Sequence, residues 1–217
     1  MPKKIGLIFT IAGTVLILAA LSIFLYNKKK DEDAGQNSQV LLSDVQQVIE
    51  ERKADGPSAS EPLTDDDDSQ PSKVNESLSE SDKVALVDGY ECIGYLSIPD
   101  LDLNLPILSE WDYDRLDVAP CRQFGSVDTN DLVIAGHNYE NHFGRLKLLE
   151  PGAVVIFTDM DGVEYKYRAM VIDILAPTEV SRVQNSGYDL VLYTCTLGGK
   201  TRVTVFLNRI ENNDTNQ

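Results

Sequence analysis

The stretch Leu190-Val191-Leu192-Tyr193-Thr194-Cys195 is an apolar run that ends abruptly in a hydroxyl and a thiol. A glycine-rich turn at residues 197–200 (LGGK) follows it, and a β-rich run from Thr201 to Ile210 comes next. Two β-type runs joined by such a turn predict an antiparallel hairpin. Cys195 then ends one strand and Arg202 lies near the start of its neighbour, so the thiol and the guanidinium share one edge of a sheet.

A second apolar run, from Leu132 to Gly136, also ends in a titratable residue, His137. A cysteine, a histidine and an arginine at the ends of buried strands are the components of a thiol acyl-transfer site. We expect Cys195 to be the nucleophile, His137 the general acid that protonates the leaving amine, and Arg202 the oxyanion stabiliser. The alternatives are an inert core thiol, a capping histidine and a salt-bridged arginine. The other histidine, His142, better fits a surface or capping role.

These residues carry a family resemblance. The Tyr-Thr-Cys strand end, the Ala-Gly-His strand end and the following arginine resemble the signature of sortases, the cell-surface cysteine transpeptidases of Gram-positive bacteria. The resemblance extends over about residues 89–210 and includes IGYLSIP at 93–99 and LPI at 105–107. It implies cleavage of an LPxTG-like sorting signal in secreted proteins through a thioacyl-enzyme. The acyl group would pass to an amine of a peptidoglycan precursor or of a pilin subunit.

The same resemblance implies which residues contact the substrate. The threonine before the catalytic cysteine lines the substrate pocket in the family, and Thr194 occupies that position. We also expect Ala135 to contact the peptide. The segment 177–188 is expected to form the wall of an apolar groove and to set specificity, with Val180 and Ser181 as contacts. The sortase subclass stays open, because the motifs match no single class.

From Tyr90 onward, short β-type runs alternate with turn residues, which is typical of a barrel or sandwich. The resemblance and the strand count predict a mainly β fold, a closed eight-stranded sortase-like barrel with short helices. Short helices are expected at 111–116 and 142–149. An eighth strand is expected at either Cys121–Gly125 or Val180–Val183. The other strands are expected at Ile93–Ile98, Leu103–Leu108, Leu132–His137, Ala153–Thr158, Val163–Leu175, Leu190–Cys195 and Thr201–Ile210.

The segment before the barrel divides into two parts. Residues 5–26 form an uncharged apolar run long enough to cross a bilayer as a signal anchor, with residues 1–4 in the cytoplasm. A cleaved signal peptide is the alternative, although the run lacks a good cleavage site. Residues 27–88 are acidic and polar and predict a largely disordered linker, with a short amphipathic helix at 40–52. The catalytic domain then spans 89–212, and 213–217 form a disordered tail.

Charge and cysteine content limit the partners. The formal net charge of −16 argues against nucleic acid, which requires a basic face. We expect no cofactor and no metal site; a calcium site is compatible with the carboxylates, but no EF-hand-like spacing supports it. Three cysteines leave open whether Cys92 and Cys121 pair while Cys195 is free. The lack of a nearby resolving cysteine argues against a disulfide oxidoreductase.

Three functions are therefore weighed for this chain. The first, which the resemblance favours, is a single-pass membrane transpeptidase with an extracellular catalytic domain. The second is a cysteine protease that uses the same residues with water as the acceptor. The third is a membrane-anchored binding domain in which Cys195 is merely structural. The lysines on both sides of the apolar run do not decide its orientation, so the extracellular placement rests on the resemblance.

Overall fold

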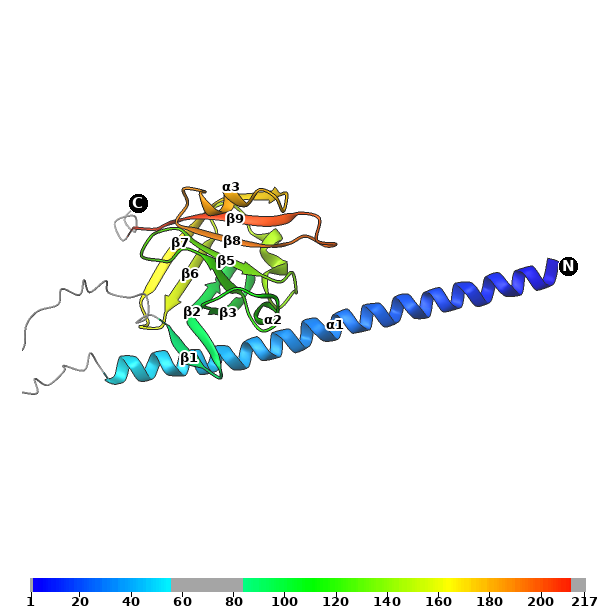
Figure 1. Ribbon diagram of the computed structural model, residues 1–217, viewed down its shortest axis with the longest axis horizontal. Helices are drawn as coiled ribbons and strands as arrows, with labels where there is room; N and C mark the ends of the chain where they lie inside the picture. The colour runs from blue at the N-terminus through cyan, green and yellow to red at the C-terminus, as the bar shows by residue number, and fades with distance from the viewer. Residues whose placement is uncertain (1, 56–83, 212–217) are drawn as a thin grey trace, which may run out of the picture.

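A computed structural model describes residues 2–55 and 84–211 of the chain. It consists of one very long helix, α1 (Pro2–Asp55), and a β-barrel that lies against the C-terminal half of that helix. Figure 1 shows the N-terminal half of α1 extending away from the barrel. The predicted tail at 213–217 lies outside the described residues.

The barrel closes through strand pairing. Its sheet has the order β1-β2-β3-β4-β5-β8-β9-β7-β6, and an additional pairing of β2 with β6 completes a ring of eight strands. The strand β1 pairs only with the start of β2 and stands outside this ring. The bounds are β1 Ala85–Val87, β2 Tyr90–Ile98, β3 Leu103–Leu108, β4 Cys121–Phe124, β5 Leu132–Gly136, β6 Val154–Asp159, β7 Glu164–Leu175, β8 Leu190–Cys195 and β9 Arg202–Arg209.

The predicted closed eight-stranded barrel is thus confirmed. The expected strand at Cys121–Gly125 forms as β4, whereas the alternative at Val180–Val183 is wrong, because these residues lie in the short helix α3 (Val180–Gln184). One strand, β1, was not predicted, since its three residues fall in the segment assigned to the linker. Gly94 has a φ of 140° where β2 shifts register, and its lack of a side chain allows close approach to the Thr158 carbonyl of β6.

Besides α3, three short helices lie in the connections of the described barrel. The expected turn of helix near Trp111 is α2 (Tyr113–Leu116), whose N-terminus is capped by Asp112. The segment after His137 forms a 3-10 helix, η3 (Phe143–Leu148), and another, η2 (Pro99–Leu101), joins β2 to β3. Burial follows the predicted spacing in η3, because Phe143, Leu146 and the following Leu149 all pack into the barrel core.

The expected disordered linker is wrong for residues 27–55 and for the strand β1. Helix α1 continues without a break to Asp55, because no proline occurs between Pro2 and Pro57 and the segment is rich in helix-forming residues. The apolar face of the amphipathic helix predicted at 40–52 packs on the barrel: Leu41, Val45 and Ile49 are buried against β1, β2 and β3. Tertiary packing of this apolar face stabilises a helix whose polar composition had suggested disorder. The rest of the predicted linker, 56–83, lies outside the described residues.

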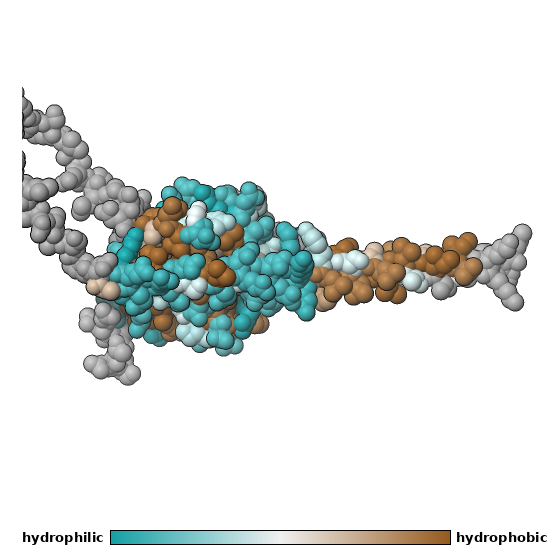
Figure 2. All heavy atoms as spheres, turned by 90° about the horizontal axis from the view of Figure 1, so that it is seen from below, coloured by the Kyte–Doolittle hydropathy of each residue, from teal (hydrophilic) through white to brown (hydrophobic). Residues whose placement is uncertain are grey.

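The N-terminal half of α1 has different surroundings. Its apolar side chains are exposed on all sides, and none of the most apolar stretch is buried against the barrel. Figure 2 shows this half as a hydrophobic rod protruding from a largely hydrophilic domain. A helix that is apolar all round and unpacked is long enough and apolar enough to cross a bilayer.

Candidate functional site

Strand pairing places the three predicted catalytic residues at one edge of the barrel. Strands β5 and β8 run parallel with Gly136 opposite Thr194, so His137 follows at the level of Cys195. Strand β9 runs antiparallel to β8, and Cys195 lies directly opposite Arg202. The C-terminal ends of the parallel strands β5 and β8 meet at the same edge of the sheet, and the tight turn after β8 returns the start of β9 to that edge.

The alternation of strand residues places these groups on the same face. Cys195 lies two residues after Tyr193, and His137 two residues after Ala135, which is the register partner of Tyr193. All three candidate residues are partly exposed. Two carbonyls of the β8–β9 turn hold Arg202: its Nη1 donates to Gly199 O at 3.0 Å and to Thr201 O at 3.1 Å. The remaining N–H groups of the guanidinium stay available for a ligand.

His137 has an acidic neighbour that the sequence did not suggest. Its Nε2 lies 3.3 Å from Asp117 Oδ1, at the C-terminal end of α2. Burial lowers the pKa of His137; the Asp117 carboxylate opposes that shift, and Lys30 of α1 adds to it. The imidazole therefore lies between one group that favours its charged form and one that disfavours it.

The three cysteines have distinct surroundings. All are free in the structure, and only Cys195 is partly exposed, whereas Cys92 and Cys121 are buried beneath α1. Burial raises the pKa of both inner thiols to about 12, so they stay protonated and unreactive at neutral pH. Cys92 is thus a small buried residue in a strand, and Cys195 is the cysteine that solvent can reach.

A groove of about 220 Å³ lies on the outer face of the sheet, and Arg202 is the one of the three candidate residues that lines it. Its floor includes Tyr193, whose hydroxyl donates a hydrogen bond to Gln123 Oε1 at 2.5 Å. Arg202 lies at one end, and the connection from β7 to β8 forms one wall. The apolar lining comes from Trp111, Tyr113, Phe124, Leu175, Ala176, Pro177, Val180 and Val183.

Of the four predicted substrate-binding residues, one lines the groove and three do not. Val180 lines the groove, and the neighbouring Ser181 does not. Thr194 is 2 % exposed and lies on the opposite face of β8 from Cys195, because neighbouring strand residues alternate in direction. Ala135 is buried in the cluster that contains Cys121 and α1. The structure therefore places Thr194 and Ala135 in the core rather than in the groove.

Sequence reasoning missed several residues around the site. Gln123, Phe124 and Tyr193 lie in the groove but have no distinguishing spacing in the chain. Asp117 was missed because its link to His137 exists only after folding. The aromatic residues Trp111 and Tyr113 gave the clearest available signal, since exposed aromatic side chains beside a short helix are unusual outside binding surfaces.

His142 does not have the expected surface or capping role. It is completely buried, and burial lowers its pKa to about 4. Its ring lies 5.7 Å from that of Tyr139, which is in turn 4.9 Å from that of His137. His142 is therefore a neutral core residue behind the candidate acid.

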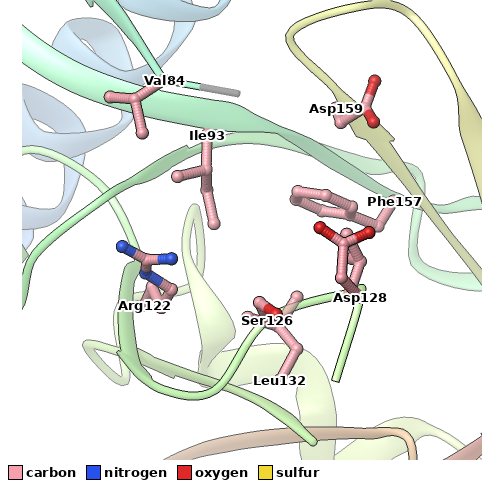
Figure 3. A pocket seen from close by; sticks show the side chains of 9 residues that line it. Val84, Ile93, Arg122, Ser126, Asp128, Leu132, Phe157 and Asp159 are labelled. Carbon is pink, nitrogen blue, oxygen red and sulfur yellow. The ribbon is translucent and has the colours of Figure 1, made fainter. Parts of the chain in front are cut away.

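The opposite end of the barrel holds a second, smaller hollow (Figure 3). It measures about 40 Å³, enough for one or two water molecules and too small for a peptide side chain of any size. Its lining combines Ile93, Leu132 and Phe157 with the polar Arg122 and Asp128. Across residues 2–55 and 84–211, no group of three His, Cys, Asp or Glu side chains is arranged to hold a metal ion.

Comparisons with known proteins point to one family. A family model described as the sortase domain matches residues 96–210. Sortase A from Corynebacterium diphtheriae, a lid mutant, is similar at 26% identity over 58% of this chain and 74% of its own, with a TM-score of 0.49. Sortase C1 from Streptococcus suis gives 22% identity over 58% and 76%, with a TM-score of 0.50. A sortase D5 transpeptidase of Clostridium perfringens gives 21% over 55% and 79%, with a TM-score of 0.49. No curated protein matches the chain.

Proposed function

The chain belongs to the sortase family, and from that premise we propose that it is a membrane-anchored transpeptidase acting on the sorting signal of secreted proteins. Membership implies a cysteine transpeptidase in general terms. We assign the chemistry to Cys195, His137 and Arg202. The observation that carries this assignment is the strand register, which sets Cys195 opposite Arg202 and brings His137 to the same edge.

The proposed reaction has two acyl-transfer steps. The Cys195 thiolate attacks a peptide carbonyl, and Arg202 donates hydrogen bonds to the oxygen as negative charge develops on it. The C–N bond then breaks, His137 gives its proton to the departing amine, and a thioester remains on Cys195. An incoming amine attacks the thioester, its proton passes to His137, and the thiolate leaves. A new amide forms and the enzyme returns to its starting state.

The groove supports a peptide with apolar side chains near its cleavage point. Aliphatic and aromatic groups line it, and its polar contacts are few: Gln123, Glu179 and Arg202. The leucine and proline of an LPxTG-like signal match such a lining. Val180 on the wall makes the connection from β7 to β8 the segment that sets specificity. The acceptor would be an amine of a peptidoglycan precursor or of a pilin subunit.

The long helix supports a location at the outer face of the cell membrane. Lys30, four residues beyond the apolar run, lies 3.7 Å from Asp117 beside His137. Four helical residues rise about 6 Å. The catalytic edge of the barrel would therefore lie close to the bilayer surface, where a secreted protein and a lipid-linked acceptor can both reach it.

Mass spectrometry of the enzyme incubated with a sorting-signal peptide, with and without an added amine, tests this proposal. We expect an acyl adduct on Cys195 and, when the amine is present, a new amide product. Cys195→Ala should give neither, while Cys121→Ala, which changes a buried thiol of the same chain, should give both. Hydrolysis alone, with no amide even at high amine concentration, would instead indicate a cysteine protease. No adduct with any peptide would leave a binding domain.

A further inference from the structure

We propose that Asp117 is a positioning residue for His137 and that Lys30, on the juxtamembrane part of α1, balances its charge. The membrane helix would thereby form part of the support of the active site. This inference rests on the proposed function, since it concerns the histidine assigned as the acid. It adds two residues that lie outside the strand ends from which the site was built.

The geometry centres on the Asp117 carboxylate. Its Oδ1 lies 3.3 Å from His137 Nε2 and accepts a hydrogen bond from the Tyr139 hydroxyl at 3.2 Å. Its Oδ2 lies 3.7 Å from Lys30 Nζ. One oxygen therefore holds the imidazole and the tyrosine, and the other faces the helix. Because Nε2 is held in this way, Nδ1 is the nitrogen left to exchange a proton with the substrate.

Helix α1 is closely docked at this point. The Asn141 backbone N–H and side-chain amide donate to Asp31 Oδ1 and to the Asp31 carbonyl, both at 3.3 Å. A Cβ at Gly35 would lie only 2.8 Å from Asn141 Cβ, so glycine permits the close approach of the helix. These contacts anchor the segment that immediately follows His137. These contacts hold the backbone of α1 at Lys30, whose exposed side chain reaches Asp117 from there.

Charged and titratable groups reach His137 from every neighbouring element. Two act on its pKa in opposite directions: the Asp117 carboxylate raises it and the Lys30 ammonium lowers it. The other titratable groups on the neighbouring elements are Asp31 on α1, Tyr139 and His142 in its own segment, Cys195 at the end of β8 and Arg202 at the start of β9.

Asp117 and Lys30 shift the pKa of His137 in opposite directions, so removing each group should give opposite results. Removing the carboxylate with Asp117→Asn should lower the pKa of His137 by about 0.5–1 pH unit, since both side chains are partly exposed and solvent screens the pair. Removing the ammonium with Lys30→Gln should raise it by a smaller amount. At pH values above the pKa, the charged fraction of His137 in Asp117→Asn should fall about 3- to 10-fold. The rate of acyl-enzyme formation, the step in which His137 donates its proton, should fall with it.

The measurement is an NMR titration of the ¹⁵N-histidine-labelled full chain in lipid nanodiscs, with the His137 signal assigned by its loss in His137→Gln. Asp117→Glu should restore the wild-type titration. Asp114→Asn, which neutralises an exposed carboxylate on α2 three residues earlier, is the matched control and should leave the titration unchanged. In rate measurements, the limb of the pH profile that reports His137 should move with the NMR value.

Two results would overturn the inference: an unchanged His137 titration in Asp117→Asn, or a downward shift in Lys30→Gln. If Asp117→Asn does not fold, the direction of the His137 pKa shift in Lys30→Gln, a change on the exposed surface of the helix, still tests the inference. The titration does not depend on turnover. A chain that forms no acyl adduct would therefore refute the proposed function while leaving the Asp117–His137 coupling measurable.

Discussion

The two ends of strand β9 carry the same side chain in different surroundings. At the far end of the barrel, Arg209 Nη1 donates to Asn130 at 3.0 Å, its guanidinium lies 4.5 Å from the centre of the Tyr165 ring, and its backbone N–H donates to Asp189. At the near end, Arg202 bonds only carbonyls of its own turn, and no carboxylate of the described chain lies within ion-pair distance of it.

The comparison of Arg209 with Arg202 distinguishes a polar group whose hydrogen bonds are used within the fold from one with donors free to bind a ligand. At the far end, the network continues to Asp159, which accepts from the Tyr165 hydroxyl and from backbone N–H groups, so polar groups there satisfy one another. At the near end, Arg202 keeps free donors and Cys195 is a partly exposed thiol. Unused hydrogen-bonding capacity beside a groove is what a substrate-binding edge requires.

The largest expected effect is a contrast between the two arginines. Arg202→Ala should reduce the rate of acyl transfer about 10²- to 10³-fold, because it removes the donors that stabilise the oxyanion. Arg209→Ala should leave the rate of the folded enzyme within about twofold and reduce the free energy of unfolding by about 1–2 kcal/mol. Steady-state kinetics and chemical unfolding of both variants test the contrast. Equal losses of rate in the two variants would contradict it.

A second prediction concerns α1, which contacts both ends of the barrel. It reaches the near end at Lys30 and the far end at Arg52, which lies 3.6 Å from Asp161 in the turn between β6 and β7. Ile49, 2 % exposed, packs close to that turn. Ile49→Ala should lower the free energy of unfolding by about 2–4 kcal/mol through lost burial and a residual cavity. The change lies far from the thiol, so the rate of the folded enzyme should change little.

Denaturant unfolding of the full chain in detergent micelles measures this effect. Gln46→Ala, an exposed position on the same stretch of α1, is the control and should change stability by less than about 0.5 kcal/mol. If Ile49→Ala proved as stable as Gln46→Ala, the helix would not be packed on the barrel as the structure describes. A large loss of rate without loss of stability would show that the two ends are coupled.

How much the sequence could predict follows from what each signal requires. Mainly apolar runs such as Leu190–Cys195 and Leu103–Leu108 gave strands with the expected bounds, because burial on a sheet dictates their composition. The convergence of His137, Cys195 and Arg202 followed from strand ends alone. The segment at Val180 was ambiguous, since a short run of that length fits a strand or a helical turn equally well.

The errors arose where tertiary contacts decide. Residues 27–39 are too polar to predict an ordered segment, and the sequence predicted a helix only at 40–52. Packing of apolar side chains such as Leu41, Val45 and Ile49 onto the barrel stabilises the whole segment 27–55 as one helix. Thr194 was assigned from its motif position, whereas strand alternation turns its side chain to the opposite face from Cys195. Ala135 lies on the same face as His137, but its neighbours in the fold bury it. Asp117 meets His137 through a contact that no local pattern encodes, because the two residues lie on separate segments of the chain.

The smallest expected effect concerns the buried histidine behind the near end. The pKa of His142 is lowered to about 4 by burial, against an ordinary value of 6.5, so the folded chain holds it neutral while the unfolded chain protonates it below pH 6.5. The unfolded state then binds more protons between these values, and stability falls as the pH is lowered through this range. Between pH 7 and pH 5 the wild-type chain should lose about 2 kcal/mol from this group.

His142→Phe should remove that part of the acid sensitivity, because phenylalanine fills the buried site without titrating. Denaturant unfolding at pH 7 and at pH 5 for the wild type and the variant gives the comparison. His137→Gln serves as the control: burial also lowers the pKa of that partly exposed ring, but Asp117 opposes the shift, so its contribution should have the same sign and be smaller. An equal loss of stability on acidification in the wild type and in His142→Phe would mean that His142 is not buried neutral. The distinction between His142 as a neutral core residue and His137 as the proposed acid would then be lost.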